Sequence, residues 1–269
     1  MTFIVILITL LVERFFDWSH LRHWEWFARL QQTAGERFKG MSPYLVLAIT
    51  IVPILAVVLL IQLLTQNLLY GFFGFIFQII VLIYCLGPKN LWADGYTSIN
   101  ALVAGDRGFA AEKLRATFDV TEHEDNSALH RSLLNHLFIE ANKRVFATIF
   151  WFFILGPTGA LLYRLVALSA SPEARTVQAV LDWIPVRIFT VMFALGGHFV
   201  QVLNCWRKNA SHGLDGNDAM LQDCGAAALG YEDNNVFPND GSAEKQAIGL
   251  LDRSFVIVLV LMAVVELIF

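Results

Sequence analysis

Long apolar runs alternate with polar stretches along the whole chain. Tyr44–Leu64 carries no charged side chain over about twenty residues, a length that crosses a ~30 Å hydrocarbon core at ~1.5 Å per residue. Further runs of this kind are Asn67–Leu86, Val145–Leu168, Ile188–Asn204 and Ser254–Phe269. The pattern therefore predicts a bundle of membrane helices, of which the first two form a tight antiparallel hairpin.

A further apolar run at the start of the chain, Met1–Val12, is too short for a simple span. Twelve residues reach about 18 Å as a helix, so a crossing would draw Glu13 and Arg14 towards the hydrocarbon. These adjacent side chains are expected to neutralise each other there. Met1–Val12 also lacks a basic leading region and a small-residue cleavage site, which predicts a first membrane element rather than a removable signal peptide.

Three polar segments separate the runs: Glu13–Pro43, Gly87–Arg144 and Cys205–Arg253. Together they hold sixteen of the nineteen Lys and Arg residues. In the simplest path they share one side of the membrane, and the positive-inside rule places them in the cytoplasm with both termini outside. The alternative path rests on Gly156-Pro157, which would break the third span into two half-helices that re-enter the membrane. The Asp182 region would then face the cytoplasm, and the last polar segment would lie outside.

Composition supports the same class of protein. The 269 residues are 57% hydrophobic and 16% charged, and the mean hydropathy is +0.58, whereas soluble domains contain about 45–50% apolar and about 25% charged residues. We therefore predict an all-α integral membrane protein with about five to six membrane helices and amphipathic cytoplasmic helices, in a single domain over residues 1–269. No basic cluster typical of nucleic-acid binding occurs, and the three cysteines are predicted to stay reduced and unpaired.

Common catalytic and cofactor motifs are absent from the sequence. There is no GxxxxGK[ST], GxGxxG, HExxH or GxSxG pattern. His20 and His23 lie three residues apart, a spacing that suits metal ligands, but no third ligand is evident and Trp24 and Trp26 follow. We therefore predict no metal site and expect an interfacial amphipathic helix with aromatic anchors in this region.

Polar side chains gather where the second polar segment meets the third apolar run. Glu140, Asn142, Lys143 and Arg144 lie there. Lys143 and Arg144 are expected to anchor the end of the span on the cytoplasmic side. Glu140 is one helical turn from both His136 and Arg144, so an ion pair on the same face is expected. Glu140 is also the carboxylate best placed to face a cavity at the membrane interface.

Other polar residues fall inside or beside the apolar runs, where a charge is costly. Arg164 is expected to extend its charge to the outer interface by snorkelling. Asp182 and Arg187 lie close together in LDWIPVR, and a structural Asp–Arg pair is expected. His198 follows two glycines, which allow close approach of another helix or a ligand, and its expected role is a hydrogen bond to a neighbouring helix.

Four stretches of the sequence resemble one family. LLVERFF near the start, ALVAGDRGFAAEKL in the middle, FWFFILGPTGALLYRLV and LDWIPVRIFTVMFALGGHF are similar to the AmpE family. Its members are bacterial inner-membrane proteins associated with β-lactamase induction, commonly encoded beside an amidase of cell-wall recycling. The resemblance therefore implies an inner-membrane signalling protein connected with the response to antibiotic and with cell-wall recycling.

The AmpE family in turn resembles the CobD/CbiB membrane enzymes of cobalamin synthesis, which use ATP and Mg²⁺ to join an aminopropanol group to a corrinoid carboxylate. Ala104–Asp106 matches a short cytoplasmic helix of those enzymes. The residues that fall on their GGAPxALAYK segment are Gly156, Ala160, Leu161, Tyr163 and Arg164, and those that fall on their DDxxNxxPAR are Asp182, Pro185 and Arg187. Two stretches depart from the pattern: EANKRVF replaces their AENxxDG, and VALSAS replaces their NTLDSM. Carboxylates that would compensate Mg²⁺–ATP are missing from both.

Three functions are open at this point. The first is a regulatory membrane protein with a polar cavity for a small or lipid-linked ligand and no assigned catalytic residue. The second is an ATP- and Mg²⁺-dependent amide synthetase with Asp106 and Glu140 among its acids, and the third is a transporter of a cell-wall fragment. Expected partners are membrane lipid, such a ligand and a second copy of the chain, with no nucleic acid. The residues expected to line the cavity are Glu13, Arg14, Asp106, Glu140, Asn142, Arg144, Tyr163, Arg164, Asp182, Trp183, Arg187 and His198.

Overall fold

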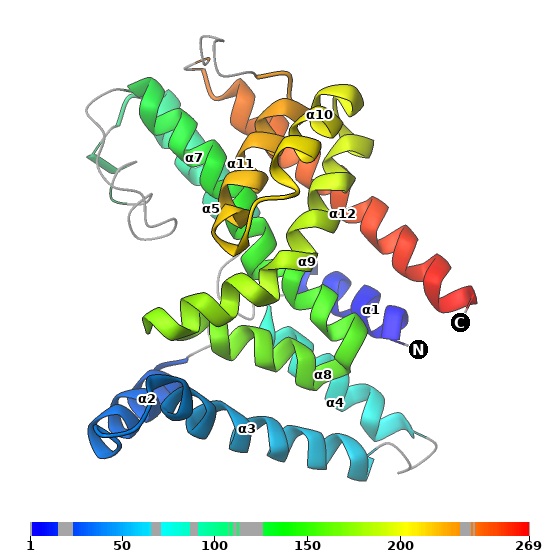
Figure 1. The fold of residues 1–269 in the computed structure, drawn as a ribbon. Coiled ribbons are helices and arrows are strands. Elements are labelled where there is room, and N and C mark those ends of the chain that lie inside the picture. The colour runs from blue at the N-terminus through cyan, green and yellow to red at the C-terminus, as the bar shows by residue number, and fades with distance from the viewer. Residues whose placement is uncertain are drawn as a thin grey trace. The chain divides into compact units, whose positions relative to one another are not determined.

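The computed structural model describes residues 2–15, 24–65, 71–86, 91–106, 108–109, 112, 126–231, 238 and 240–268. All regular elements within these residues are helices (Figure 1). In this part of the chain, four helices are long and apolar enough to cross a membrane, and two shorter apolar helices accompany them. The prediction of an all-α membrane protein is confirmed.

The chain forms two compact units, each built from segments distant in sequence. The first unit comprises Met1–Pro88, Ala147–Asp182 and Met262–Phe269. Its complete helices are α1 (Thr2–Phe15), α2 (Glu25–Arg37), α3 (Pro43–Thr65), α4 (Phe72–Cys85) and α8 (Ala147–Leu168). The helix α8 packs against α1, α3 and α4, while α2 packs on α3. The centre of this unit is therefore α8.

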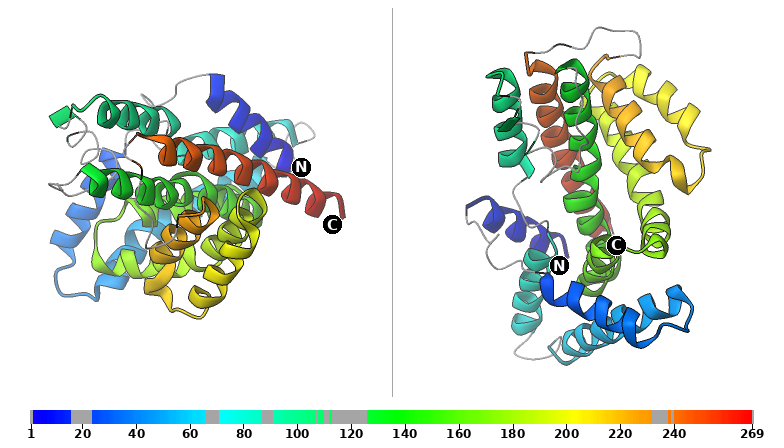
Figure 2. Two further views of the ribbon diagram at one scale, coloured as in Figure 1. Left: turned by 90° about the horizontal axis from the view of Figure 1, so that it is seen from above. Right: turned by 90° about the vertical axis from the view of Figure 1, so that its left-hand side faces the viewer.

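The second unit comprises Lys89–Phe146 and Trp183–Leu261. Its complete elements are α5 (Leu91–Val103), α7 (Asn126–Ala141), a π-helical turn (Asn142–Phe146), α10 (Phe199–Asn209), a 3₁₀ turn (Leu214–Gly216) and α11 (Asn217–Ala228). The helix α11 packs against α7 and α10, and Figure 2 shows α10 and α11 side by side. Two long helices, α9 (Pro172–Gly196) and α12 (Ser242–Ile268), contribute residues to both units.

Phenylalanine rings fill the core of the second unit. The ring of Phe189 stacks on Phe146 with centroids 4.4 Å apart, and it also contacts Phe193 at 4.7 Å and Phe255 at 5.3 Å. Phe138 extends the cluster from α7, with its centroid 5.2 Å from that of Phe193. Aromatic pairs at these spacings add about 0.5–1.5 kcal/mol each beyond their buried area. The cluster therefore joins α7, α9 and α12.

The helix α3 has the character of a lipid-facing span. It contains 23 residues, which corresponds to about 35 Å of helix. Apolar side chains remain exposed along it, including those of Val52, Leu60 and Leu64. Since lipid tails are as apolar as leucine, such a surface needs no protein cover in a bilayer.

A break divides α8 at Gly156, as the Gly-Pro pair in the sequence predicted. Gly156 has φ 67° and ψ −155°, a backbone conformation that lies outside the helical region, and Pro157 follows it. Figure 1 shows α8 bent rather than straight. The Thr158 hydroxyl donates to Gln62 Oε1 of α3 at 3.2 Å, so a polar side chain from a neighbouring helix supports the break.

The predicted fourth span differs from the helices observed. The helix α9 already begins at Pro172, and it ends at Gly196, before α10 starts at Phe199. The LDWIPVR stretch therefore lies within a helix, whereas the sequence pattern placed it immediately before the first residue of a span. Pro172 explains the early start, because proline fits the first turn of a helix, where its missing N–H is not needed.

Candidate functional site

A buried hydrogen bond joins two of the predicted residues in the first unit. The Tyr163 hydroxyl of α8 donates to Asp182 Oδ1 of α9 at 2.7 Å, and both side chains are buried. A carboxylate in this environment requires such donors, because an unsatisfied buried charge is expensive. The pair therefore fixes α8 against the first part of α9.

Arg164 lies in the same region, and its position corrects one expectation. The side chain is only 5% exposed. It is buried within the unit instead of extending to the outer interface. We call Tyr163, Arg164 and Asp182 the buried polar cluster. In a membrane protein, an ionisable residue in such a place is a candidate for function as well as for structure.

Arg187 holds a turn of the second unit in place. Its guanidinium donates to the backbone oxygens of Trp183 at 2.9 Å, Ala210 at 3.2 Å and His212 at 2.9 Å. The guanidinium also donates to Asn217 Oδ1 at 3.2 Å. Its central carbon, Cζ, lies 3.9 Å from the centroid of a Trp183 ring, which is a cation–π contact. These contacts connect α9 to the segment between α10 and α11. The multiple donors of a planar guanidinium make arginine suited to this task.

The expected Asp182–Arg187 pair is replaced by two separate sets of contacts. Five positions along one helix place two side chains about 140° apart around its axis. Asp182 bonds to Tyr163 in the first unit, whereas the Arg187 guanidinium donates to four oxygens of the second unit. The two charges therefore serve different structural roles on α9.

A small apolar pocket of about 270 Å³ lies beside Arg187. Its lining includes Trp183 and Arg187 from the predicted set, and otherwise consists of Ile184, Ile188, Val191, Met192 and Trp206. The Trp206 indole N–H donates to the Arg187 carbonyl oxygen at 3.3 Å. Because the Arg187 guanidinium already donates to four protein oxygens, this pocket offers a ligand mainly apolar side chains.

The predicted ion pair at the start of the third apolar run is confirmed. Arg144 Nε donates to Glu140 Oε2, and both side chains are largely buried. Asn142 is fully buried in the π-helical turn, while Lys143 of the same turn contacts Asp218 Oδ2 of α11 at 3.0 Å. Glu140 is therefore committed to a structural partner. His136 contacts the Ser132 carbonyl instead.

The remaining predicted residues belong to separate segments of the chain. Asp106 is exposed, and its carboxylate accepts the backbone N–H of Phe109 at 3.1 Å. Glu13 is half-buried on α1, whereas the side chain of Arg14 lies outside the described part of the structure. His198 has an exposed side chain, and its backbone N–H donates to the Ala228 carbonyl at 3.0 Å. A role of the twelve residues in lining a ligand cavity stays a prediction.

One buried pair was missed by the sequence analysis. His130 Nδ1 of α7 lies 2.5 Å from Glu244 Oε1 of α12, and both side chains are completely buried. The other polar atoms of the pair, His130 Nε2 and Glu244 Oε2, are buried without a hydrogen bond within the described structure. The available signal was a histidine on the apolar face that also carries Leu133, Leu134 and Leu137.

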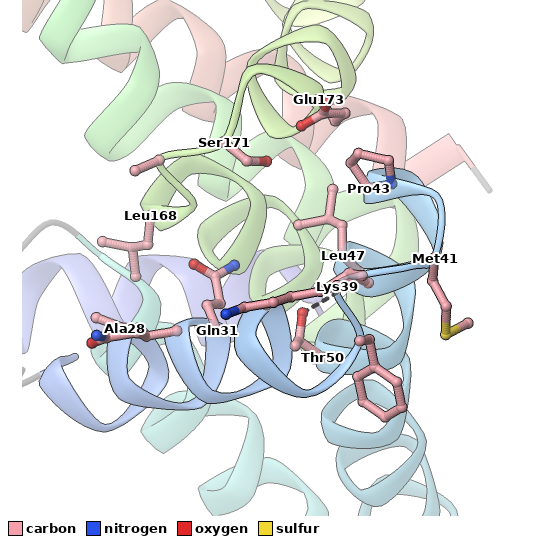
Figure 3. Close-up of a pocket in the computed structure, with 15 residues that line it drawn as sticks. Ala28, Gln31, Lys39, Met41, Pro43, Leu47, Thr50, Leu168, Ser171 and Glu173 are labelled. Carbon is pink, nitrogen blue, oxygen red and sulfur yellow. Dashed lines mark hydrogen bonds between the residues drawn. The ribbon is translucent and has the colours of Figure 1, made fainter.

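The larger cavity lies in the first unit, with a volume of about 610 Å³ (Figure 3). Three elements surround it: α2 with the loop after it, the first two turns of α3, and the α8–α9 corner. Its lining residues are Ala28, Gln31, Gln32, Gly35, Phe38, Lys39, Met41, Pro43, Val46, Leu47, Thr50, Leu168, Ala170, Ser171 and Glu173. None of the twelve predicted residues is among them.

Polar contacts hold the wall of this cavity. Gln31 of α2 donates to the Ser169 hydroxyl at 2.5 Å, and Ser169 donates to the Leu165 carbonyl at 2.8 Å. Figure 3 shows Gln31 and Lys39 on the α2 side, with Ser171 and Glu173 at the start of α9. These opposite charges form no ion pair with described residues. The cavity thus combines apolar walls with one cationic and one anionic side chain.

Aromatic contacts hold α2 beside the membrane helices. The Trp26 indole N–H donates to the Tyr84 hydroxyl of α4 at 3.0 Å, and the Trp24 ring lies 4.4 Å from the Tyr84 ring. Trp and Tyr side chains prefer the boundary between water and hydrocarbon. The interfacial amphipathic helix stays a prediction, and His20 and His23 lie outside the described residues.

Comparison with known proteins connects this chain to two groups. A family model described as regulatory signalling modulator protein AmpE matches residues 1–268. A cobalamin biosynthesis protein CobD from Chromobacterium violaceum is 27% identical over 169 residues, 58% of this chain and 54% of that protein. The CobD protein of Stutzerimonas stutzeri is 28% identical over 171 residues, 58% of this chain and 56% of that protein. The chain spans about half the length of these curated relatives, and no solved structure gives a significant match.

Proposed function

Because the chain belongs to the AmpE family of regulatory signalling modulator proteins, we propose that it binds a small or lipid-linked ligand in the larger cavity. The observation that carries this proposal is the cavity of about 610 Å³ itself. Its size lies within the range of about 300–1,000 Å³ that is usual for small-molecule sites. Binding there regulates β-lactamase induction as part of cell-wall recycling.

The lining favours an amphiphilic ligand. Phe38, Met41 and Leu47 offer an apolar wall, whereas Lys39 and Glu173 offer opposite charges. A ligand whose head group carries both an acidic and a basic function would match these two side chains. Its hydrocarbon or other apolar part would lie against the first turns of α3. This arrangement needs no catalytic residue.

We further propose the bacterial inner membrane as the location, with α2 on the cytoplasmic side. The polar segment that contains α2 has five basic residues, Arg14, Arg22, Arg29, Arg37 and Lys39. Segments rich in Lys and Arg near the ends of membrane helices remain in the cytoplasm. The larger cavity would then be accessible to ligands from the cytoplasmic leaflet.

The test is to fill the cavity with one side chain. Gly35 lines the cavity, and a Cβ atom added there would meet no atom within 4 Å. Gly35→Phe should therefore occupy the ligand space without disturbing the fold. Gly40→Phe is the matched control, because Gly40 is equally open but does not line the cavity. Each variant replaces the native protein in a host with inducible β-lactamase, and membrane levels are compared by immunoblot.

The proposal expects a loss of normal induction in Gly35→Phe and none in Gly40→Phe. Native mass spectrometry of the purified proteins should show a bound small molecule or lipid in the control and a reduced amount in Gly35→Phe. Unchanged induction by Gly35→Phe at normal membrane level would contradict a role for this cavity. Reduced induction in both variants to the same extent would point to the α2–α3 corner in general instead.

The CobD relatives favour a second candidate, an ATP- and Mg²⁺-dependent amide synthetase. Among its suggested acids, Asp106 is exposed, while Glu140 is paired with Arg144. The purified protein would be incubated with Mg²⁺ and ATP, and nucleotide binding would be followed by native mass spectrometry. Saturable ATP binding that is lost in Asp106→Asn would support the enzyme, whereas a protein without nucleotide affinity would favour the regulatory function.

A further inference from the structure

Two cysteines of the second unit are in direct contact. Cys205 belongs to α10 and Cys224 to α11, and their sulfur atoms lie 3.0 Å apart. Both are free thiols. A disulfide holds its sulfur atoms about 2.05 Å apart, so bond formation requires a movement of only about 1 Å. The helices α10 and α11 are packed together, which keeps the two thiols close without a covalent bond.

The two thiols differ in their surroundings. Cys224 is fully buried, whereas Cys205 is partly accessible. The hydrogen bond from Cys224 lowers the pKa of the Cys205 thiol, and the Asn209 amide contributes in the same direction by donating to Cys205 Sγ at 3.3 Å. The same bond to Cys205, together with burial, raises the pKa of Cys224. Cys205 is therefore the nucleophile of the pair, because the thiolate is the reactive form.

We propose that Cys205 and Cys224 form a thiol–disulfide modification site, oxidised reversibly by small-molecule disulfides of the glutathione type. The Cys205 thiolate attacks one sulfur of the oxidant, forms a mixed disulfide and releases one thiolate of the oxidant. Cys224 then gives up its proton to water and attacks the Cys205 sulfur, which releases the second thiolate. The two released thiolates take up the two protons that the cysteines have lost. In sum, two protein thiols and one disulfide become one protein disulfide and two small thiols, and two electrons pass to the oxidant.

Oxidation closes the loop that holds the Arg187 side chain. The segment between the two cysteines contains the carbonyls of Ala210 and His212 and the amide of Asn217, which hold the Arg187 guanidinium. A covalent link between α10 and α11 restricts the opening of this segment. The oxidised form should therefore protect its backbone amides from hydrogen exchange more strongly than the reduced form. This inference is independent of the proposed ligand cavity.

The experiment uses the full-length protein in nanodiscs and a series of reduced and oxidised glutathione mixtures. After alkylation of the remaining thiols, intact mass and peptide mapping identify each cysteine. The expected product has a Cys205–Cys224 link, which lowers the mass by two hydrogens before alkylation, and it is alkylated at Cys85. Amide exchange in residues 206–223 should slow at least tenfold on oxidation, and reduction should reverse both changes.

Single substitutions separate the roles of the two sulfurs. Cys224→Ser should accumulate glutathione at Cys205, since the resolving thiol is gone, whereas Cys205→Ser should leave Cys224 unmodified. Cys85→Ser is the control and should form the internal disulfide like the native protein. The proposal is overturned if native Cys205 and Cys224 remain two thiols in fully oxidised glutathione, or if Cys205 keeps a stable glutathione adduct beside intact Cys224.

Discussion

Gly159 offers a direct test of the broken helix α8. A Cβ atom at this position would lie 2.3 Å from the Trp151 carbonyl oxygen and 2.6 Å from Leu155 Cβ. Trp151 lies eight residues earlier, which would be about 12 Å along an uninterrupted helix. The close approach exists only because the chain changes direction at Gly156. Gly159→Ala therefore places a methyl group where the two halves of α8 meet.

The size of the effect follows from this geometry. Real Cβ contacts are essentially never shorter than 3.0 Å, so the two halves would have to separate by at least about 0.7 Å. Overpacking of this kind costs about 1–3 kcal/mol, and a rigid backbone carbonyl places the expected cost near the upper end. Replacing glycine by alanine inside a helix returns about 1 kcal/mol. We therefore expect Gly159→Ala to lower the free energy of unfolding by about 2 kcal/mol.

The measurement is reversible unfolding in mixed detergent micelles, followed by circular dichroism. Gly249→Ala on α12 is the matched control, because a Cβ atom there meets nothing within 4 Å. It should leave stability unchanged or raise it by about 0.5–1 kcal/mol. If α8 were continuous, Gly159→Ala would stabilise the protein as Gly249→Ala does. A stabilising Gly159→Ala substitution would therefore refute the bend, whatever its magnitude.

Three further predictions concern single contacts. Tyr163→Phe removes the donor to a buried carboxylate and should cost about 1–2 kcal/mol in the same unfolding assay, whereas Tyr96→Phe at an exposed ring should change stability by less than about 0.5 kcal/mol. Arg187→Lys cannot reproduce four bonds from one planar group, so hydrogen exchange in the turn between α10 and α11 should rise at least tenfold. Asp240 Oδ1 accepts hydrogen bonds from the backbone N–H and the hydroxyl of Ser242, the first residue of α12. These bonds lower the pKa of Asp240, so the carboxylate that accepts them is fully ionised above about pH 3.9 and is lost as the pH falls through the lower folded-state pKa. Exchange in the first turn of α12 should therefore accelerate on acidification beyond the intrinsic pH effect, and Asp240→Asn should abolish that excess.

Local features of the fold were predictable from the sequence because their causes are local. Gly156-Pro157 in an apolar run predicts an interruption, since proline lacks the N–H that a continuous helix requires. The pairing of Glu140 with Arg144 follows from one helical turn of spacing. The all-helical class follows from the length of the apolar runs.

The start of α9 had a local signal that hydropathy alone conceals. Ser171, Pro172 and Glu173 form a typical helix beginning, and the Ser171 hydroxyl accepts the Ala174 N–H at 3.1 Å. The residues that follow are polar, so a search for uninterrupted apolar runs places the helix start near Ile188. Capping chemistry is therefore the better guide to where this span begins.

The candidate site was less predictable, because its residues meet through the tertiary fold. His130 and Glu244 are separated by 114 positions, and nothing close to either residue in the sequence indicates the other. The lining of the larger cavity comes from α2, α3 and the α8–α9 corner, whose side chains are ordinary for a membrane interface when each element is considered alone. The resemblance to a family directed attention to charged residues of α8 and α9, which the structure uses chiefly to connect helices.

The position of the larger cavity at the beginning of α3 has a consequence for how binding is quantified. Pro43, Val46 and Thr50 lie in the first two turns of this apolar helix and also line the cavity. If an amphiphile enters the cavity laterally from the adjoining leaflet, the occupancy of the cavity depends on the mole fraction of the amphiphile in the lipid. The aqueous concentration affects occupancy only through the amount of amphiphile that partitions into the lipid. Titrations at one aqueous dose should therefore shift when the amount of lipid is changed, and they should coincide when occupancy is plotted against ligand per lipid.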